Sequence, residues 1–252
     1  MGFAPQLIPY YGGKVKLAPR YPRPKYDAIV EPFAGGAAYS LLYAERKVTL
    51  VEPYELLVNL WRYLIAVTPT EILQLPLVEH VDDAHVCEEA KSLIGWWLNT
   101  CTTSPRKRAS QRWKSGICPN SFWGETRRWL ISEQVTRIKH WHVLHAKYED
   151  LEITDEATWF IDPPYQQAGR CYKHSSRQID FTHLSEWCQG LDGQVIVCEN
   201  LGADWLPFIP FALGKTSRAK RGSGKMTNRE AVWYGGRDRN DSEHVFDLMA
   251  AV

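Results

Sequence analysis

The strongest constraint on the fold is a strand, turn and helix pattern near the N-terminus. An apolar run at 26–30 leads into the segment 31–37, which contains the pair Gly35-Gly36. Residues 39–44 then read as a helix, and a second apolar run at 47–51 follows. Strands that alternate with helices are typical of a parallel sheet covered by helices. A glycine turn before a helix also brings a ligand close to bare backbone at the helix N-terminus.

This glycine turn differs from two well-known phosphate-binding loops. The G-x-G-x-x-G spacing is absent, and no Gly-Lys-Ser/Thr sequence follows. Glu52 ends the second strand, where an acid can hydrogen-bond the two hydroxyls of a ribose. A solvated strand-end acid is the alternative interpretation.

A carboxylate, two prolines and an aromatic residue follow a third apolar run. Asp162-Pro163-Pro164-Tyr165 comes directly after the buried-strand pattern at 157–161. Proline fixes its own φ and restricts the residue before it, so the backbone carbonyls here point in fixed directions. Such a group can grip a planar amine, with acceptors at its edge and a ring against its face. An edge strand ended by prolines is the alternative.

The rest of the chain extends the alternation of strands and helices in two stretches, 1–60 and 141–252. The expected strands are 27–31, 47–51, 141–146, 157–161, 194–198, 210–217 and 230–235. The last two can pair antiparallel at the sheet edge. Residues 61–140 break the alternation and read as helices, with the expected helices at 54–66, 84–100 and 126–139 around a basic loop at 101–125. We therefore expect a doubly wound, mostly parallel seven-stranded sheet with an inserted, mainly helical subdomain.

A net charge of +1 hides two basic blocks. Residues 101–147 carry ten Lys or Arg against two acids, and residues 212–229 carry six and no acid. Four aromatic residues lie among the charges of the first block, namely Trp113, Phe122, Trp123 and Trp129. Basic groups hold phosphates and flat rings stack on bases, so the pattern favours a nucleic-acid partner. A solvated basic surface is the alternative, and Trp96-Trp97 reads as a buried helix face.

Other features argue against disulfides, metals and membranes. Six scattered cysteines form no C-x-x-C pair and are expected to be reduced thiols in the cytoplasm. His140 and His142 fall on one face by alternation and His145 on the other, so we expect no metal site. No uncharged run has the length of a bilayer span, and no signal peptide is evident, so no membrane partner is expected.

Three motifs in this order resemble the Dam-like, DPPY-type alpha class of S-adenosylmethionine-dependent DNA adenine-N6 methyltransferases, whose fold is the Rossmann-like class I methyltransferase sheet. The motifs are Pro9-Tyr10-Tyr11-Gly12-Gly13-Lys14, Glu31-Pro32-Phe33-Ala34-Gly35-Gly36 and Asp162-Pro163-Pro164-Tyr165. Weaker matches are the segment 52–60 and the residues Tyr172, Phe181, His183 and Leu184. The resemblance covers about residues 7–60 and 141–235.

The resemblance implies S-adenosylmethionine as the cofactor and places a catalytic domain at 1–60 and 141–252. Asp162 and the Pro163 carbonyl would grip the adenine amine, with Pro164 and Tyr165 completing the catalytic motif. The implied cofactor residues are Tyr10, Tyr11, Gly12, Gly13, Lys14, Glu31, Pro32, Phe33, Ala34, Gly35, Gly36, Ala37, Glu52, Tyr148 and Asp162. Many family members have an Asp before the aromatic residue that holds adenine. Lys147 stands here, which leaves Glu149 or Asp150 as replacements.

Double-stranded DNA is the implied partner, and 61–140 the implied target-recognition subdomain. The expected DNA-contacting residues are Arg106, Lys107, Arg108, Arg112, Lys114, Arg127, Arg128, Lys220, Arg221, Lys225 and Asn228. The loop that begins with Gln166 and Gln167 is expected to order over the flipped base, with an ordinary mobile surface loop as the alternative.

Several alternatives stay open at this point. The same chemistry on cytosine N4 or on adenine in RNA is the nearest. A non-catalytic nucleic-acid-binding regulator and a protein-glutamine methyltransferase, which normally has Asn in the first motif position, are more remote. The resemblance fits an orphan or phage-type enzyme in the cytoplasm of a bacterial or phage-infected cell, associated with the nucleoid. It does not require a restriction endonuclease partner, and it leaves the recognition sequence and the oligomeric state open.

Overall fold

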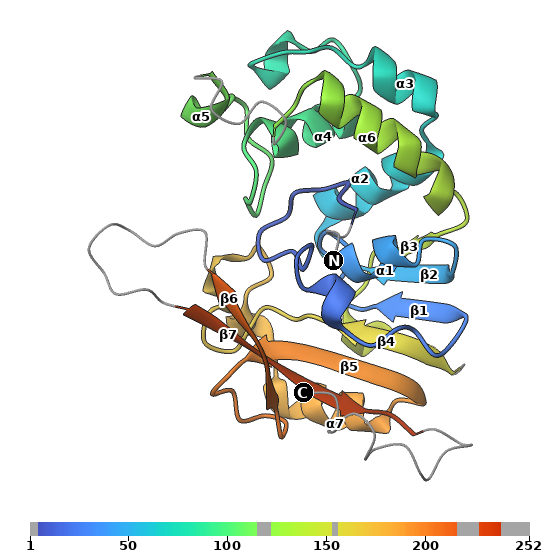
Figure 1. Ribbon diagram of the computed structural model, residues 1–252, viewed down its shortest axis with the longest axis vertical. Coiled ribbons are helices and arrows are strands. Elements are labelled where there is room, and N and C mark those ends of the chain that lie inside the picture. The colour runs from blue at the N-terminus through green and yellow to red at the C-terminus, as the bar shows by residue number, and fades with distance from the viewer. Residues whose placement is uncertain (1–4, 115–121, 153–155, 216–226, 238–252) are drawn as a thin grey trace. The chain divides into compact units, whose positions relative to one another are not determined.

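The computed structural model describes residues 5–114, 122–152, 156–215 and 227–237. The chain divides into two compact units. Unit 1 holds Met1–Arg23 and Val30–Leu151, and unit 2 holds Pro24–Ile29 and Glu152–Val252. The strands of the described residues form a seven-stranded, mostly parallel sheet in the order β3-β2-β1-β4-β5-β7-β6 (Figure 1). This order is consistent with a Rossmann-like fold.

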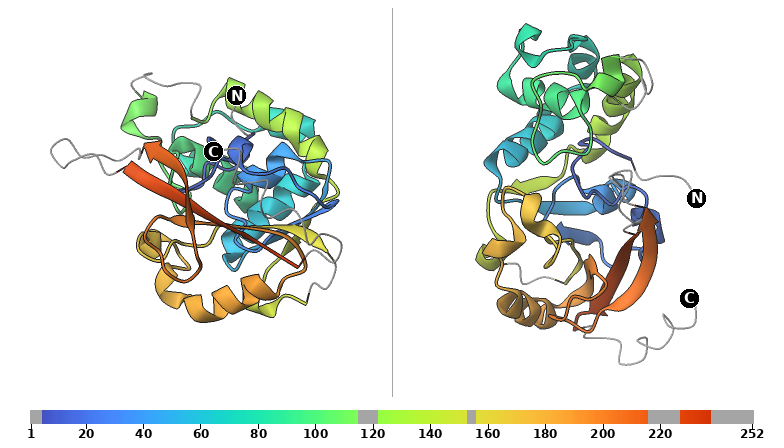
Figure 2. Two further views of the ribbon diagram at one scale, coloured as in Figure 1. Left: turned by 60° about the horizontal axis from the view of Figure 1, so that its bottom comes forward. Right: turned by 90° about the vertical axis from the view of Figure 1, so that its left-hand side faces the viewer.

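Every strand expected from the sequence is present. The strands are β1 (Ala28–Glu31), β2 (Lys47–Val51), β3 (His142–Leu144), β4 (Ala157–Ile161), β5 (Gly193–Asn200), β6 (Ile209–Lys215) and β7 (Thr227–Gly235). β2 pairs with β3 and β4 pairs with β5 in parallel. β7 runs antiparallel to both β5 and β6, which confirms the expected edge pair, seen as a twisted ribbon in Figure 2.

The apolar run of β4 explains its place inside the sheet. All five of its residues are buried, as expected for a strand covered on both faces. Trp159 of β4 meets Trp187 of α7 edge-on, with ring centroids 5.5 Å apart. The Trp159 indole N–H donates to the Asp192 carbonyl at 3.0 Å, so the one polar atom of this large ring is satisfied.

The described residues also contain α-helices. They are α1 (Ala38–Leu42), α2 (Glu55–Ala66), α3 (Pro69–Gln74), α4 (Glu88–Leu98), α5 (Gln111–Lys114), α6 (Glu125–Val135) and α7 (Phe181–Gly190). The helices expected at 84–100 and 126–139 are shorter than predicted. α3 and α5 were not expected, and α7 was expected only as part of the alternation of strands and helices, without a range. α3 and α6 lie side by side (Figure 1). Residues 61–140 fall within unit 1, and a separate inserted subdomain over this range stays a prediction.

Tryptophans form much of the core of unit 1. Trp61 of α2 and Trp96 and Trp97 of α4 are fully or almost fully buried, which confirms the expected buried face of α4. The Trp97 indole N–H donates to the Leu7 carbonyl at 2.9 Å. α4 thereby anchors the segment that leads into the N-terminal motif.

Five cysteines in the described part of the chain, Cys87, Cys101, Cys171, Cys188 and Cys198, are free thiols. Cys118 lies outside the described residues. None of the helices described here combines the length and the hydrophobicity that crossing a bilayer requires.

Replacement of Gly193 by alanine should destabilise unit 2. Gly193 has φ 102°, and an added Cβ would lie 2.2 Å from the Ala157 carbonyl oxygen of β4. We expect a loss of about 2 kcal/mol or more in the free energy of unfolding, measured in urea. Gly190, at the end of α7, is the matched control, because its added Cβ would meet no atom within 4 Å. Equal stabilities of the Gly193→Ala and Gly190→Ala variants would contradict the packing described here.

Candidate functional site

The glycine turn of unit 1 joins β1 to α1 through a tightly bonded loop. Glu31, at the end of β1, is buried, and its Oε1 accepts a hydrogen bond from the Ser40 N–H at 2.8 Å. This bond satisfies an N–H group that the helix N-terminus leaves without a helical partner. Gly35 (φ 47°) and Ala37 (φ 46°) both adopt left-handed backbone. That conformation suits glycine but costs alanine about 1–2 kcal/mol, and such strain is concentrated at functional sites.

The N-terminal motif lies directly against this turn. A Cβ added to Gly35 would stand 3.1 Å from Tyr10 Cδ1, and one added to Gly36 would stand 3.1 Å from the Ile8 carbonyl oxygen. An added Cβ would make a tight contact at either position, so this close approach favours glycine. The Tyr10 ring also packs against Trp96 of α4 at a centroid distance of 5.4 Å. The structure thus brings together two predicted cofactor motifs that are separate in the sequence.

The segment after α4 holds the N-terminal motif in place. The Cys101 N–H donates to the Pro9 carbonyl at 3.0 Å, and the Tyr11 N–H donates to the Thr102 carbonyl at 3.1 Å. Lys14 is buried, with its Nζ 3.5 Å from the Gly12 carbonyl oxygen. The Lys14 ammonium therefore lies within the motif rather than in bulk solvent.

Glu52 directly follows β2, and its carboxylate accepts hydrogen bonds from the glycine turn and from Tyr54. Oε2 accepts from the Gly35 N–H at 3.2 Å, and Oε1 accepts from the Tyr54 N–H at 3.0 Å. Burial raises the pKa of Glu52 to about 7, although both hydrogen bonds lower it. Each carboxylate oxygen keeps a further lone pair, so the ribose contact stays a prediction. The structure adds a role that the sequence did not predict, which is to hold the turn.

Two aromatic rings line the same part of unit 1. Phe33 of the glycine turn and Tyr148, which follows β3, have ring centroids 5.5 Å apart. Next to them, Asp150 Oδ2 accepts from the Lys147 N–H at 3.1 Å, and Lys147 Nζ lies 3.8 Å from Glu149 Oε2. Both expected replacements for the adenine-binding Asp therefore already contact Lys147, and the polar adenine contact has no assigned residue.

In unit 2 the motif from Asp162 to Tyr165 directly follows β4, and a turn over residues 166–168 follows the motif. Pro163 is buried and the other three residues are half-buried. The Gly169 N–H donates to the Tyr165 carbonyl at 2.6 Å, and an added Cβ on Gly169 would lie 2.5 Å from the Pro164 carbonyl carbon. The Tyr165 hydroxyl donates to Glu230 Oε1 of β7. The motif is therefore fixed both along its backbone and at the tip of its ring.

Glu199, near the end of β5, is fully buried beside this motif. Its Oε2 accepts from the Gln166 N–H at 3.0 Å and from Trp205 Nε1 at 3.1 Å, and its Oε1 accepts from the Asn200 N–H at 2.7 Å. Burial raises the pKa of Glu199, the three hydrogen bonds lower it, and the charge of Asp162 raises it. A second carboxylate thus stands within electrostatic reach of the predicted catalytic acid.

The two glutamines after the motif are bonded to another loop of unit 2. Gln166 Nε2 donates to Asp204 Oδ1 at 3.2 Å, and Gln167 Nε2 donates to the Gly202 carbonyl at 3.3 Å. Both side chains are therefore bonded to the segment that follows β5, and the ordering of this loop over a flipped base stays a prediction.

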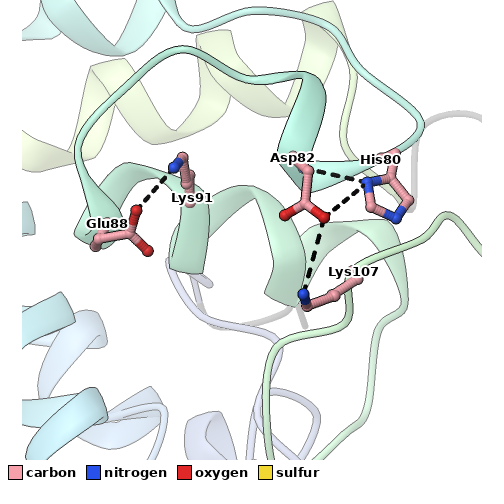
Figure 3. A network of polar contacts seen from close by, with 5 residues as sticks. All are labelled: His80, Asp82, Glu88, Lys91 and Lys107. Carbon is pink, nitrogen blue, oxygen red and sulfur yellow. Dashed lines mark hydrogen bonds and ion pairs between the residues drawn. The ribbon is translucent and has the colours of Figure 1, made fainter.

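The tripeptide from Arg106 to Arg108 is exposed on unit 1, and its backbone is fixed from two sides. The Arg106 N–H donates to the Gly95 carbonyl of α4 at 3.0 Å, and the Val81 N–H donates to the Lys107 carbonyl at 2.8 Å. Lys107 Nζ lies 3.8 Å from Asp82 Oδ2, an ion pair marked by a dashed line in Figure 3. The charge of Lys107 is therefore partly offset by an acid. Arg112 is exposed as well.

Arg127 and Arg128 of α6 contact the protein itself. The Arg127 guanidinium lies 3.8 Å from the centroid of the Trp97 ring, and burial lowers its pKa to about 10. Arg128 Nη1 donates to the Leu75 carbonyl at 2.6 Å. Both side chains fasten α6 to neighbouring parts of unit 1, a role the sequence did not predict. Their predicted DNA contacts stay predictions.

Two of the four aromatic residues expected to stack on bases belong to the core. Phe122 and Trp123 are 5% and 1% exposed, and Trp123 Nε1 donates to the Pro76 carbonyl at 2.8 Å. The stacking expectation is therefore wrong for these two, because their faces are covered by protein. Trp129 is 54% exposed, and Trp113 is half-buried.

Several predicted DNA contacts lie outside the described residues. Lys220, Arg221 and Lys225 fall in the range 216–226. The side chains of Lys114 and Asn228 are likewise outside the described part of the molecule.

Glu199 and Glu230 were missed by sequence reasoning. Glu199 comes near the end of the apolar run of β5, which is the signal that singled out Glu52 at the end of β2. No comparable signal marks Glu230, because its contact with Tyr165 depends on how β7 is placed in the sheet.

Within the described ranges, no group of three or more His, Cys, Asp or Glu residues is arranged to hold a metal ion.

A scan against protein-family models matches no family, and a search of the curated proteins finds no matching relative. The site is therefore interpreted from its own geometry.

The ionisation of Glu52 should make the stability of unit 1 depend on pH. Folding raises the pKa of this acid from 4.5 to about 7, so proton binding favours the folded state. The stabilisation of the folded state by the protonated Glu52 is complete below about pH 4.5. It is lost as the pH rises through about 7, which lowers the free energy of unfolding by about 3 kcal/mol. In urea unfolding, the free energy of unfolding of the native protein, relative to that of Glu52→Gln, should fall by this amount between about pH 4.5 and about pH 8.

Glu55→Gln is the matched control, because Glu55 is exposed at the start of α2. Its stability difference from the native protein should vary far less over the same range. A Glu52→Gln difference that stays constant with pH would show that Glu52 is ionised normally in the folded state.

Proposed function

We propose that this chain is a site-specific DNA methyltransferase that moves a methyl group from S-adenosylmethionine to the exocyclic N6 of a flipped-out adenine. The observation that carries the proposal is the fixed setting of Asp162-Pro163-Pro164-Tyr165 at the carboxyl end of β4. Ligands of open α/β sheets bind outside the carboxyl ends of the strands. In this proposal the helices within 61–140 form the target-recognition subdomain.

The cofactor half of the proposal is supported by the glycine turn of unit 1. Gly35 and Gly36 let Tyr10 and Ile8 approach the turn closely, so the two implied cofactor motifs lie against each other. Glu52 offers carboxylate lone pairs for a ribose, and Phe33 and Tyr148 offer rings for adenine. These groups fit S-adenosylmethionine, which would supply an electrophilic methyl group.

The catalytic half rests on the acceptors of unit 2. The exocyclic amine of adenine is a poor nucleophile, because its lone pair is delocalised into the ring. The Asp162 carboxylate and the Pro163 carbonyl accept its hydrogen bonds, which favours a tetrahedral nitrogen with a localised lone pair. As the nitrogen gains the methyl group, the bond between that methyl group and the sulfonium sulfur would break and S-adenosylhomocysteine would leave. The nitrogen would then lose one proton, which Asp162 would take. Oriented acceptors and proximity contribute most of the rate.

The Tyr165 ring stacks on the base in this proposal. A base inside a duplex is out of reach, so it is flipped out at a cost of about a few kcal/mol. Stacking of roughly 1–3 kcal/mol per base offsets part of that cost. The hydroxyl bond to Glu230 holds the ring at its tip and leaves stacking to its faces.

Replacement of Asp162 should remove activity but not cofactor binding. Asp162→Ala deletes one of the two proposed acceptors, and we expect a loss of about 10³-fold or more in methyl transfer to DNA. The affinity for S-adenosylmethionine, measured by calorimetry, should fall far less than turnover, because all the other implied cofactor residues lie in unit 1 and stay in place. Glu186→Gln, an exposed change on α7 of the same unit, is the control. Near-normal turnover of Asp162→Ala would refute the assignment.

The exposed tripeptide gives a test of the DNA contact. Arg106→Gln with Arg108→Gln should weaken DNA binding and lower the salt slope by about 0.9 for each phosphate that is no longer neutralised. Asp82→Asn should strengthen binding, because it frees Lys107 from its ion pair. Glu133→Gln makes the same charge change at an exposed site of α6 and serves as the control. Titrations at several salt concentrations measure both effects, and an unchanged slope would remove the tripeptide from the interface.

A further inference from the structure

Two buried carboxylates stand on neighbouring strands next to the motif in unit 2. Glu199 lies on β5 and Glu230 on β7, and the antiparallel register pairs Glu199 with Ala231 and Asn200 with Glu230. They are 0% and 5% exposed. Buried carboxylates are expensive unless they are hydrogen-bonded, so their partners indicate what they hold.

The partners of Glu199 are main-chain and indole N–H groups. Oε2 receives the N–H of Gln166, the residue directly after Tyr165, together with the indole N–H of Trp205. Trp205 is itself packed between Phe181 and Phe208, with ring centroids 5.4 Å and 5.0 Å away. Glu199 therefore links the backbone of the motif to a rigid aromatic cluster.

Glu230 contacts the side chain of Tyr165, the residue that precedes Gln166. Its Oε1 accepts the hydroxyl of Tyr165, a bond between a hydroxyl donor and a carboxylate acceptor, which is among the stronger kinds. Tyr165 is thus held twice. Its ring tip is bonded to β7, and the peptide after it is bonded to β5.

We propose that Glu199 and Glu230 are positioning residues that together set the plane of the Tyr165 ring and the direction of the acceptors before it. This inference rests on the proposed function, in which Tyr165 stacks on the base that carries the amine. A ring that is bonded at its tip, on a backbone that is bonded at the next peptide, samples fewer orientations, so the base is ordered by the protein at little further entropic cost. Neither carboxylate needs to touch the substrate.

A merely structural role makes a different prediction. If the two acids only stabilise unit 2, their removal lowers the melting temperature and leaves kcat unchanged below it. If they position Tyr165, kcat falls while the affinity for S-adenosylmethionine stays the same. The acids should also act as a unit with Tyr165, so their effects should not add.

The experiment is a double-mutant cycle on the full chain. Tyr165→Phe removes the donor, Glu230→Leu removes the acceptor, and the double variant removes both. Each single variant should lose about 10- to 100-fold in kcat for DNA methylation, and the double variant should lose no more than the worse single one. Glu230→Gln keeps an acceptor oxygen and should recover most of the activity. Additive losses, or kcat unchanged in Glu230→Leu, would overturn the proposal for Glu230.

Glu199 is tested by a measurement that does not depend on activity. Hydrogen exchange of the Gln166 amide should be faster by about tenfold or more in Glu199→Leu than in the native protein, because the amide loses its acceptor. Glu186→Gln, on the surface of α7, should leave the exchange unchanged. Unaltered exchange in Glu199→Leu would overturn the role of Glu199.

The two levels of the proposal fail in different ways. A native protein that transfers no methyl group to DNA refutes the proposed function. In that case the exchange of the Gln166 amide, and a double-mutant cycle of unfolding free energies for Tyr165 and Glu230, still decide whether the two carboxylates hold the motif. Unaltered exchange of the Gln166 amide, together with no coupling between Tyr165 and Glu230 in the unfolding cycle, would overturn the inference outright.

Discussion

Backbone N–H groups near the carboxyl ends of the strands must find acceptors, and buried carboxylates provide them at three places. Glu31 at the end of β1 accepts from Ser40 of α1, Glu52 after β2 accepts from Gly35 and Tyr54, and Glu199 in β5 accepts from Gln166 and Asn200. An unsatisfied buried N–H costs about 1–3 kcal/mol, and an unpaired buried carboxylate costs more. Each acid and its loop therefore stabilise each other in one conformation.

Within each unit, these hydrogen bonds hold the predicted site residues in one conformation. In unit 1 the turn carries left-handed backbone at Gly35 and at Ala37, a conformation that an alanine keeps only where its surroundings enforce it. In unit 2 the motif after β4 is held at Gly169, at Gln166 and at the Tyr165 hydroxyl. Sites prepared in this way spend little free energy on ordering themselves when a ligand binds.

The sequence predicted the sheet well because its strands are short apolar runs with sharp boundaries. β2 and β4 have the predicted bounds. Two helices for which no range was predicted, α3 and α7, begin with N-capping residues that can be recognised in the sequence. Thr68 and Glu71 form a capping box at the start of α3, and the Asp180 carboxylate accepts two N–H groups at the start of α7.

The candidate site was only partly readable from the sequence. Strand ends marked Glu52 and Asp162, because a polar residue after an apolar run is a local signal. The contacts of Glu230 required the antiparallel placement of β7, and the contact between Tyr10 and the glycine turn required the packing of unit 1. Phe122 and Trp123 were misread because aromatic residues among basic ones look the same in a sequence whether they are buried or exposed.

The central claim is that the acceptors of Asp162 and Pro163 direct an adenine amine towards a donated methyl group. The most direct test incubates the protein with duplex DNA and S-adenosylmethionine that carries a deuterium-labelled methyl group, and then analyses the nucleosides by mass spectrometry. The account predicts the label in N6-methyldeoxyadenosine, and its loss in Asp162→Ala. Label in N4-methyldeoxycytidine alone, or in no nucleoside, would contradict it.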